Sequence, residues 1–339
     1  MIKEITTKDE WTAVLKQIDS YDFYHTFDYH NISCNKNTEK PILITYTNNN
    51  DVIIALPLLL REIPNSTYYD FTSIYGYAGP LSKNVTCTFD NESYISDLLS
   101  YFQSKKIVSV FSRLHPYLEQ QNNILSNFGD QVSLGKVVNI DVTLPLEESR
   151  RVYQKSLKNQ VNKLRKTCRV RKAETDADII KFVDIYNENM KRLKADDNYF
   201  FKTEYFINFM KQSDFKTDIL LIEELDTGKI IAGSMFVKTN EFVQFHLSGT
   251  RTEYLRLRPS KLFIDEMRIK ANEQNFKYFN LGGGLGSKED SLFEFKSSFS
   301  KDFRTFKIWK YIANRDVYDD LTIKFNNTNN KTFFPSYRN

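Results

Sequence analysis

Glycine, proline and cysteine are scarce in this chain of 339 residues, which contains 11, 8 and 3 of them. So little glycine and proline excludes collagen-like and low-complexity sequences. Cys34, Cys87 and Cys168 are odd in number and far apart, which excludes a disulfide framework and a zinc knuckle and favours a reducing compartment. The 4 histidines are also scattered, so we expect no metal site.

Long hydrophobic runs are absent as well. The longest, residues 52–60, is interrupted by Pro57, whereas a membrane-spanning helix needs about 20 apolar residues. The N-terminus, MIKEITTKDEW, is charged and lacks the apolar stretch of a signal peptide. The sequence therefore predicts a cytoplasmic chain without a transmembrane segment, and its length predicts two domains of roughly 150 residues each.

Charge is plentiful but unevenly placed. The whole chain carries +4, yet residues 150–172 hold 10 Lys or Arg and no acidic residue, which leaves −6 for the remainder. This basic block predicts a local anion site for a phosphate-bearing partner such as a nucleotide, coenzyme A, a lipid diphosphate or tRNA. A solvated helix face is the alternative, and the sequence leaves that choice open. The block consists of Arg150, Arg151, Lys155, Lys158, Lys163, Arg165, Lys166, Arg169, Arg171 and Lys172.

Two parts of the chain share one pattern, namely a β-hairpin, an aromatic strand ending in glycine, an amphipathic helix and a short strand. Gly79 and Gly249, which end the aromatic strands, lie 170 residues apart, as do Ile107 and Lys277 at the short strands. These equal offsets predict a tandem repeat of one αβ unit. The expected fold class is α/β (α+β), with two mixed sheets flanked by helices.

The elements around this frame define the domains. Residues 137–142 are predicted to form a strand that completes the first domain, and the basic block is predicted to form one long helix. Helices are predicted at residues 176–193 and 204–210, with Thr175 and Thr203 as N-caps. In the second amphipathic helix, Ile264 is predicted to lie off the apolar face. We therefore place the domains at residues 1–146 and 147–339.

A run of glycines, Gly282, Gly283 and Gly284, follows a predicted strand and precedes a helix expected from about Ser287. Glycine lets backbone amides approach a ligand closely, and a helix N-terminus favours an anion. A tight turn explains the run equally well. The spacing fits neither a Walker loop nor a Rossmann fingerprint, and the chain has no G-x-S-x-G motif of a serine hydrolase.

Four segments of the second half carry a family resemblance. They are His246-Leu-Ser-Gly-Thr, Leu257-Arg-Pro-Ser, Phe279-Asn-Leu-Gly-Gly-Gly-Leu-Gly-Ser and Asp290-Ser-Leu-Phe-Glu-Phe-Lys-Ser-Ser-Phe299. With them the chain resembles the FemAB-like branch of the GNAT superfamily. The resemblance implies two tandem GNAT-like domains. It also implies transfer of an acyl or aminoacyl group to an amine on a cell-envelope precursor, either an amino sugar of a surface polysaccharide or a peptidoglycan muropeptide.

Three residues are catalytic candidates. Lys296 matches the family's Phe-Lys motif, which implies that it lies by the donor and stabilises charge during transfer. His246 is a candidate base, although a histidine packed in the core is the more common case. Asp290 is a candidate for binding the acceptor ammonium, with a solvated helix face as the alternative. The donor-binding candidates are Gly282, Gly283, Gly284, Arg256, Arg258, Lys261 and Phe295, and the acceptor-binding candidates are Tyr75, Tyr77, Arg113, Lys163, Arg165 and Lys166.

The donor stays open between acyl-CoA and aminoacyl-tRNA, and no tightly bound cofactor is expected. Residues 256–263 lack the glycines with which acetyl-CoA-dependent relatives bind pyrophosphate, although Arg256, Arg258 and Lys261 offer charge instead. The expected partner is a phosphate-bearing small molecule or a lipid-linked precursor, with tRNA and a transient contact with the inner membrane surface as further options. The alternative function is a non-catalytic protein that binds RNA or a nucleotide through residues 150–172.

Overall fold

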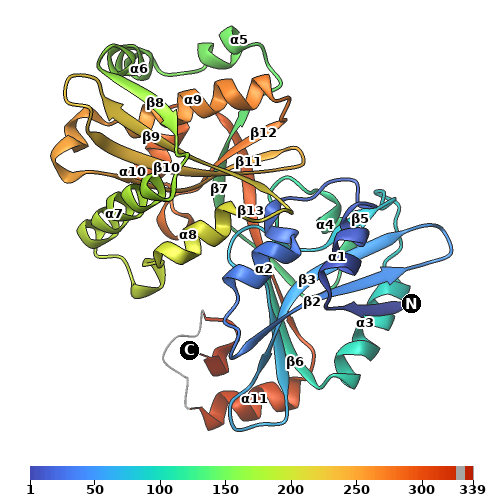
Figure 1. The fold of residues 1–339 in the computed structure, drawn as a ribbon. Coiled ribbons are helices and arrows are strands. Elements are labelled where there is room, and N and C mark those ends of the chain that lie inside the picture. The colour runs from blue at the N-terminus through green and yellow to red at the C-terminus, as the bar shows by residue number, and fades with distance from the viewer. Residues whose placement is uncertain (326–332, 339) are drawn as a thin grey trace. The chain divides into compact units, whose positions relative to one another are not determined.

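The computed structural model describes residues 1–325 and 333–338, and the chain divides into two compact units. The first unit contains residues 1–134 and 305–339, and the second contains residues 135–304. The chain passes from one unit to the other twice, within β7 (Asp130–Asp141) and within β13 (Asp302–Ile312). Figure 1 shows both units as sheets with helices on them.

The first unit is built on a mixed sheet with the strand order β1-β2-β3-β4-β6-β13, and β5 pairs with β3. Neighbouring strands are antiparallel except β4 and β6, which run parallel. Besides β13, its strands are β1 (Ile2–Ile5), β2 (Glu39–Thr47), β3 (Ile53–Glu62), β4 (Tyr69–Thr72), β5 (Leu81–Lys83) and β6 (Ile107–Arg113). Its helices are α1 (Lys8–Leu15), α2 (Phe27–Ser33), α3 (Glu92–Ser104), α4 (Gln120–Ile124) and α11 (Arg315–Lys324), with 3-10 turns η1 (Phe23–His25) and η5 (Ser336–Arg338).

The second unit repeats this arrangement with the order β7-β12-β11-β10-β9-β8, in which only β11 and β12 run parallel. Besides β7, its strands are β8 (Cys168–Lys172), β9 (Lys216–Glu224), β10 (Ile230–Thr239), β11 (Phe242–Thr250) and β12 (Tyr278–Gly282). Its helices are α5 (Leu146–Arg151), α6 (Lys155–Thr167), α7 (Asp176–Leu193), α8 (Thr203–Met210), α9 (Ser260–Glu273) and α10 (Ser291–Ser297), with 3-10 turns η2 (Asp197–Tyr199), η3 (Thr252–Leu257) and η4 (Leu285–Ser287).

Both predicted hairpins are confirmed, and their turn residues explain them. Between β2 and β3, the Asn48 side-chain oxygen accepts hydrogen bonds from the amides of Asn50 (2.9 Å) and Val52 (3.1 Å). Between β9 and β10, Gly228 has a φ of 67°, which glycine adopts without strain. The predicted tandem repeat is also confirmed, because each unit has a hairpin, a third strand, a helix and a parallel strand in the same order.

The strand that completes each sheet comes from the other half of the sequence. In the first unit Trp309 of β13 is paired with Ser112 of β6, and in the second Ile140 of β7 is paired with Phe279 of β12. The prediction that residues 137–142 complete the first domain was therefore wrong, since these residues lie in the core of the second unit. The compact units also divide the chain after residues 134 and 304, whereas the sequence predicts one boundary after residue 146.

The predicted helices differ from the observed ones in three details. The basic block is not one helix, because residues 168–172 form β8, where Cys168 and Val170 alternate with charged residues and pair with β9. Thr203 lies inside α8 instead of capping it, whereas Thr175 does cap α7. Ile264 is fully buried rather than off the apolar face, because α9 packs between α6 and the sheet.

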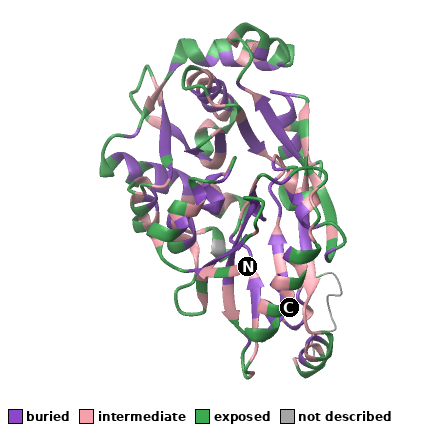
Figure 2. Cartoon of the chain, turned by 90° about the vertical axis from the view of Figure 1, so that its right-hand side faces the viewer, coloured by how far each residue is buried: buried purple, intermediate pink, exposed green. Residues whose placement is uncertain are grey.

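Each unit has its own apolar core, and Figure 2 shows the buried strands in purple and the exposed outer sides of the helices in green. In the first core, Trp309 is fully buried and donates its indole N–H to the carbonyl of Phe128 at 2.6 Å. In the second, Leu157 and Val161 of α6 join a cluster with Leu262 of α9. Of the helices in the described ranges, none is both long and apolar enough to cross a membrane.

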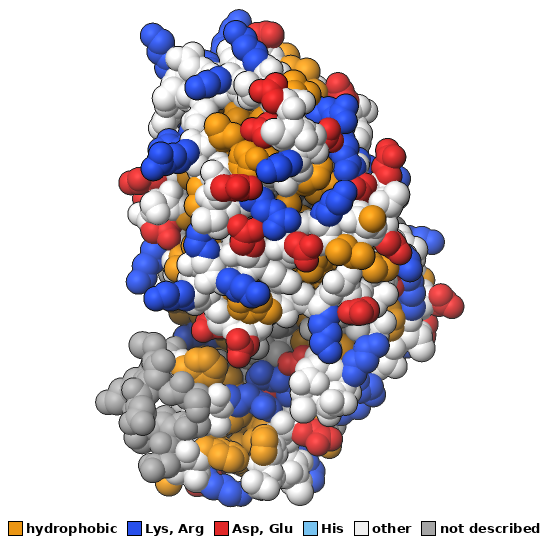
Figure 3. Space-filling model, turned by 60° about the vertical axis from the view of Figure 1, so that its left-hand side comes forward, with side chains coloured by type: hydrophobic (Ala, Val, Ile, Leu, Met, Phe, Trp, Pro, Cys, Tyr) orange, Lys and Arg blue, Asp and Glu red, His pale blue; other side chains and the backbone are white. Residues whose placement is uncertain are grey.

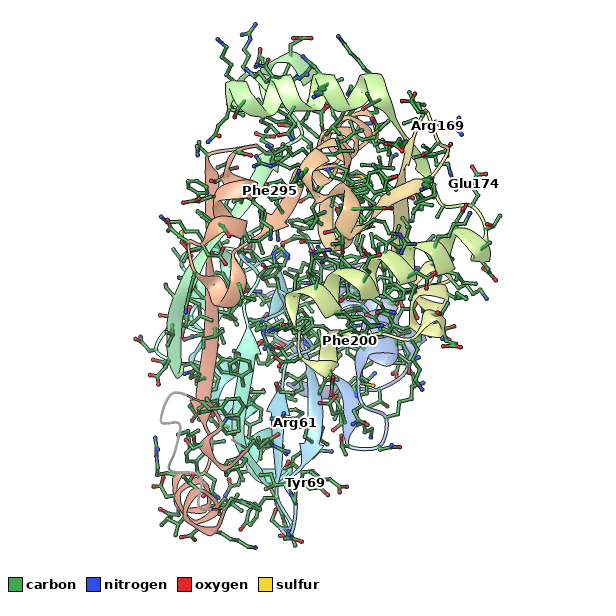
Figure 4. All side chains as sticks on the ribbon, turned by 90° about the vertical axis from the view of Figure 1, so that its left-hand side faces the viewer. Arg61, Tyr69, Arg169, Glu174, Phe200 and Phe295 are labelled. Carbon is green, nitrogen blue, oxygen red and sulfur yellow. The ribbon has the colours of Figure 1, made fainter. Side chains whose placement is uncertain are left out.

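The C-terminal residues 333–338 belong to the first unit through a buried ion-pair cluster. Asp70 of β4 is fully buried, and its carboxylate accepts hydrogen bonds from Arg61 Nε (2.8 Å), Arg338 Nε (2.5 Å) and the Tyr337 hydroxyl (3.1 Å). Figure 4 labels Arg61, which lies on β3 beside β4. Removing either arginine would leave part of a buried carboxylate unpaired, which is costly.

Two buried histidines of the first unit carry no charge at neutral pH. His30 Nδ1 donates to the carbonyl of Thr26 at 2.9 Å, and the Trp11 ring packs against His30 at 5.1 Å. Within the described part of the chain, Nε2 of His30 and Nε2 of His25 have no hydrogen-bond partner. Burial lowers the pKa of His30 to about 4 and holds the pKa of His25 well below its usual value.

We predict that the first unit loses stability between pH 7 and pH 5. Unfolded His30 takes up a proton near its ordinary pKa of 6.5 and folded His30 only near 4, so stability present above pH 6.5 is lost as the pH falls toward 4. For His30 alone, the free energy of unfolding should fall by about 2 kcal/mol at pH 5. Both tryptophans lie in this unit, so their fluorescence during urea titration measures its unfolding. His30→Gln should remove this part of the pH dependence, and an unchanged profile would contradict the prediction.

Candidate functional site

A pocket of about 510 Å³ opens in the second unit, where α6, α9 and α10 lie around the end of β11. Thr250 at the end of β11 forms part of its wall, together with Pro259 and Ser260 at the start of α9 and Gln154 just before α6. Strands β11 and β12 pair only as far as Gln244 and Asn280, so the pocket lies beyond the point where these parallel strands stop pairing.

Helix α10 is fixed at its start by Asp290. One carboxylate oxygen of Asp290 accepts a hydrogen bond from the Phe293 amide and the other from the Leu285 amide, both at 3.0 Å. These backbone bonds lower the pKa of Asp290 and make it an N-cap. The helix therefore begins at Ser291 and not near Ser287, as the sequence predicts. Both carboxylate oxygens are occupied, which favours a positioning role for Asp290 over binding of the acceptor.

One face of α10 lines the pocket, and the other packs toward the glycine loop. Ser291, Glu294 and Phe295 line the pocket, and Figure 4 labels Phe295 on this helix. Lys296 lies on the opposite face, where its side chain is 8% exposed and its Nζ donates a hydrogen bond to the carbonyl of Gly283 at 2.7 Å. Burial lowers the pKa of Lys296 to about 8, so the amine changes its charge close to physiological pH. The structure thus brings Lys296 and the glycine loop together, although neither lines the pocket.

The glycine loop is crowded by the chain's own backbone. A Cβ on Gly283 would lie 2.8 Å from the carbonyl oxygen of Lys136 in β7, and one on Gly284 would collide with the carbonyl of Lys288 and with Asp290. Gly282 has a φ of 75° and donates its amide to the Asn280 side chain at 2.9 Å. These contacts explain why glycine is needed at these positions in a tight turn, which was the alternative interpretation of the sequence.

The start of α9 offers positive charge to the pocket. Arg258 lines the pocket and is exposed, and its guanidinium has no hydrogen bond or ion pair with any described residue. Lys261 also lines it but donates to the Gln160 side chain at 2.7 Å, and burial together with the charge of Arg258 lowers the pKa of Lys261. Arg256 is exposed and lies outside the pocket lining. A helix N-terminus next to a free guanidinium favours an anion.

The basic block is partly neutralised by carboxylates. Arg165, an acceptor-binding candidate, is held on α9 by Asp265 (2.8 Å) and Glu266 (3.2 Å). Lys163 and Lys166, the other two candidates of α6, are exposed and lie outside the pocket lining. Three further cations of the block are also in ion pairs, Arg169 with Glu223, Arg171 with Asp178 and Lys172 with Asp218. Figure 4 labels Arg169 near the end of α6.

The three remaining acceptor-binding candidates belong to the first unit. Tyr75 is 60% exposed, and the Arg113 guanidinium lies 5.5 Å from the centre of its ring and 5.3 Å from that of Phe111. Tyr77 packs edge-on against Tyr24 at 5.6 Å. Tyr75 and Arg113 thus form an exposed cation–aromatic pair, a surface suited to a sugar or a phosphate.

His246, the candidate base, is a partly buried residue of β11. Its ring packs against Phe209 at 5.5 Å, and burial lowers its pKa to about 4. The imidazole is therefore neutral at pH 7 and can accept a proton. His246 does not line the pocket.

Several residues that line the pocket were not predicted from the sequence. Gln154 lies at the pocket because its backbone N–H donates a hydrogen bond to the carbonyl of Ser298 at 3.2 Å. This is a tertiary contact, and no local sequence pattern indicates it. Ser260 could have been found, because Pro259-Ser260 is typical of a helix start. In the described ranges, no group of three or more His, Cys, Asp or Glu residues could hold a metal ion.

The comparisons with known proteins agree with this geometry. Residues 150–297, which include every residue of the pocket lining except Ser298, match the family described as acetyltransferase (GNAT) domain. The matched residues all lie in the second unit. Over its full fold the chain is similar to the crystal structure of FemX, with a TM-score of 0.72, 11% identity, and coverage of 94% of this chain and 99% of that one. The likeness to FemX shows the fold that the resemblance to the FemAB-like branch implies.

Two other solved structures share the fold at low identity. L-PGS from Bacillus licheniformis matches with a TM-score of 0.55 and 12% identity, covering 94% of this chain and 95% of that one. A tandem GNAT protein from the clavulanic acid biosynthesis pathway matches with a TM-score of 0.51 and 8% identity, covering 93% and 99%. Among curated proteins, none matches the sequence. The tandem GNAT fold follows from these matches.

We predict that two glycines of the GNAT domain respond differently to alanine. Gly284→Ala should destabilise the protein by about 2–3 kcal/mol, because its Cβ collides with Lys288 and Asp290. Gly286→Ala should cost about 1 kcal/mol, because Gly286 has a φ of 60° but open space around it. Urea unfolding gives the two free energies, and hydrogen exchange at residues 282–290 shows whether the loop opens. Equal effects would mean that packing does not require Gly284.

Proposed function

We propose that this chain is an N-acyltransferase of the FemAB-like GNAT type, which transfers an acyl or aminoacyl group to an amine on a cell-envelope precursor. The observation that carries the proposal is the pocket at the N-terminus of α9, where a free Arg258 faces a cavity of about 510 Å³. A pocket of this size suits a coenzyme or a nucleotide-terminated donor. The family match of residues 150–297 supports an acyltransferase, and the fold of FemX supports the cell-envelope assignment.

In this proposal the pocket holds the phosphate-bearing part of the donor. Arg258 supplies a charged hydrogen-bond donor to a phosphate oxygen, and the N-terminus of α9 adds its dipole. Glu294 and Phe295 form the opposite wall and set the width available to the rest of the donor. Both acyl-CoA and the 3′ end of aminoacyl-tRNA present phosphates, so both remain donors in the proposal.

The transfer itself needs an unprotonated amine and a stabilised oxyanion. The amine nitrogen attacks the donor carbonyl carbon, the C–N bond forms, the C–S or C–O bond to the donor breaks, and the amine gives up a proton. In the proposal Lys296 acts in its charged form and stabilises negative charge, and neutral His246 remains the candidate base. Neither side chain lines the pocket, so the role of Lys296 rests on the family's Phe-Lys motif and that of His246 on its place in β11. Asp290 positions α10 and its lysine through the cap.

The acceptor is assigned by chemistry alone. Tyr75 and Arg113 in the first unit suit a sugar or phosphate group, and Tyr77 remains a candidate beside them. We therefore keep a phosphate-bearing or lipid-linked precursor as the acceptor and the cytoplasm as the location. The non-catalytic RNA-binding alternative rests on residues 150–172, and it is weakened because four cations of that block are in ion pairs.

We predict that coenzyme A and acetyl-CoA bind at the pocket and that Arg258→Ala weakens binding by about 10- to 100-fold, the value of a charge-assisted hydrogen bond. The matched control is Arg256→Ala, which removes the same charge two residues away, outside the pocket lining, and should change affinity by less than about threefold. Isothermal titration calorimetry measures both. Equal losses in the two variants would mean that net charge, not the pocket, binds the donor. An absence of heat with millimolar ligand would leave charged tRNA as the donor.

We predict that turnover falls as the pH rises through about 8, because Lys296 loses its charge there. Lys296→Met should lower kcat by on the order of 100-fold at pH 7 and remove the inflection, since a methionine cannot stabilise an oxyanion. Lys301→Met, an exposed lysine just after α10, is the control and should keep the wild-type profile. Circular dichroism checks the fold of each variant. Turnover that rises through pH 8 would instead make Lys296 a base, and unchanged turnover in Lys296→Met would argue for the binding protein.

A further inference from the structure

The structure separates the ten cations of the basic block into three groups. Arg150 donates to the Asn162 side chain and Lys158 to the carbonyl of Arg151. Arg165, Arg169, Arg171 and Lys172 are bound by carboxylates. The third group is exposed and makes no side-chain hydrogen bond or ion pair with the described chain. This third group, which we name the outer basic face, consists of Arg151 at the end of α5 and Lys155, Lys163 and Lys166 on α6.

The outer basic face follows from the packing of α6. Leu157, Val161 and Leu164 are buried against α9 and share one side of the helix. At 100° per residue, Lys155 and Lys166 lie on the opposite side, with asparagines between them. No acidic residue occurs from residue 149 to 173, so nothing on α6 itself offsets this charge.

An exposed apolar residue lies within this face. Val152, between α5 and α6, is 53% exposed and directly follows Arg151. Figure 1 shows α5 and α6 at the top of the view with no other element over them, and Lys and Arg side chains project there in Figure 3. The free cations therefore lie on two consecutive uncovered helices, with an exposed apolar side chain between the helices.

We propose that the outer basic face docks on the surface of a lipid bilayer that contains anionic phospholipid. Attraction to such a surface depends on the number of cations near it, and four free cations, one on α5 and three on α6, suit it. The rest of the chain is net acidic, which would orient this face toward a negative surface. Val152 can enter the interface between headgroups and acyl chains.

Three observations favour a bilayer over RNA. The outer basic face has no aromatic side chain on which a base could stack. Three of its four cations are lysines, which act as point charges, whereas arginine is the residue that recognises nucleic-acid phosphates by paired hydrogen bonds. Three of the block's arginines, Arg165, Arg169 and Arg171, are held by carboxylates instead.

The test is co-sedimentation of the full chain with vesicles of about 30% phosphatidylglycerol in phosphatidylcholine, at about 0.1 M salt. Each cation near the surface is expected to raise partitioning roughly fivefold, so Lys155→Gln, Lys163→Gln and Lys166→Gln combined should lower it on the order of 100-fold. The control combines Lys16→Gln, Lys36→Gln and Lys211→Gln, exposed lysines outside the outer basic face, and should retain most of the binding. Binding should vanish at about 1 M salt and on pure phosphatidylcholine.

A second measurement separates a bilayer from RNA. In Val152→Trp, the new indole should shift its emission to shorter wavelength with phosphatidylglycerol vesicles, whereas Trp11 and Trp309 are fully buried and give a constant background. Absence of vesicle binding by the wild-type chain, equal losses in the two triple variants, or tighter binding of a 20-nucleotide RNA hairpin than of vesicles at the same salt would each overturn the proposal. The proposal is independent of the proposed function, because partitioning is measured without turnover.

Discussion

The geometry of the second unit depends on how closely the loop after β12 approaches the rest of the backbone. Glycines on both sides make this approach possible, because a Cβ on Gly135 of β7 would collide with Ser287 and one on Gly283 would press on Lys136. Once the loop is fixed, Asp290 can cap α10 while it holds Leu285, and Lys296 can bind the carbonyl of Gly283. The pocket wall on α10 is thus a consequence of backbone packing at a distance from it.

The close packing of this loop also gives the two faces of α10 different surroundings. One face carries Phe295 into the pocket, and the other buries the Lys296 ammonium against a carbonyl. Burying an amine lowers its pKa because water solvates the charged form better than the protein interior does. A side chain whose pKa is about 8 is therefore part of the helix that supports the pocket.

Much of the fold could be predicted from local patterns. Hairpin turns at Asn48 and Gly228, the N-cap at Thr175 and the equal offsets between the two halves are signals within a few residues of each other or at one fixed distance. The local sequence predicts that residues 137–142 form a strand, but it does not indicate which strand they pair with. The pairing of β7 with β12 was therefore not predicted. In the site, the sequence singled out Lys296 and the glycine loop separately, and the hydrogen bond between Lys296 and Gly283 is known only from the structure. The sequence did not indicate that carboxylates from other elements would occupy Arg165 or that Gln154 would reach the pocket.

The first sheet is completed by β13, from near the end of the chain, and this has a consequence for biosynthesis. During translation the first unit has β1 to β6 long before its last strand exists, since β13 ends only at Ile312 of the 339 residues. Until then β6 presents an open sheet edge, and Asp70 lacks Arg338 and Tyr337. The N-terminal unit is therefore the last to be finished on the ribosome, although it is the first to be made. A single cut in the gene after residue 134 or 304 leaves the continuous second unit whole, but either cut takes β13 away from the sheet of the first unit.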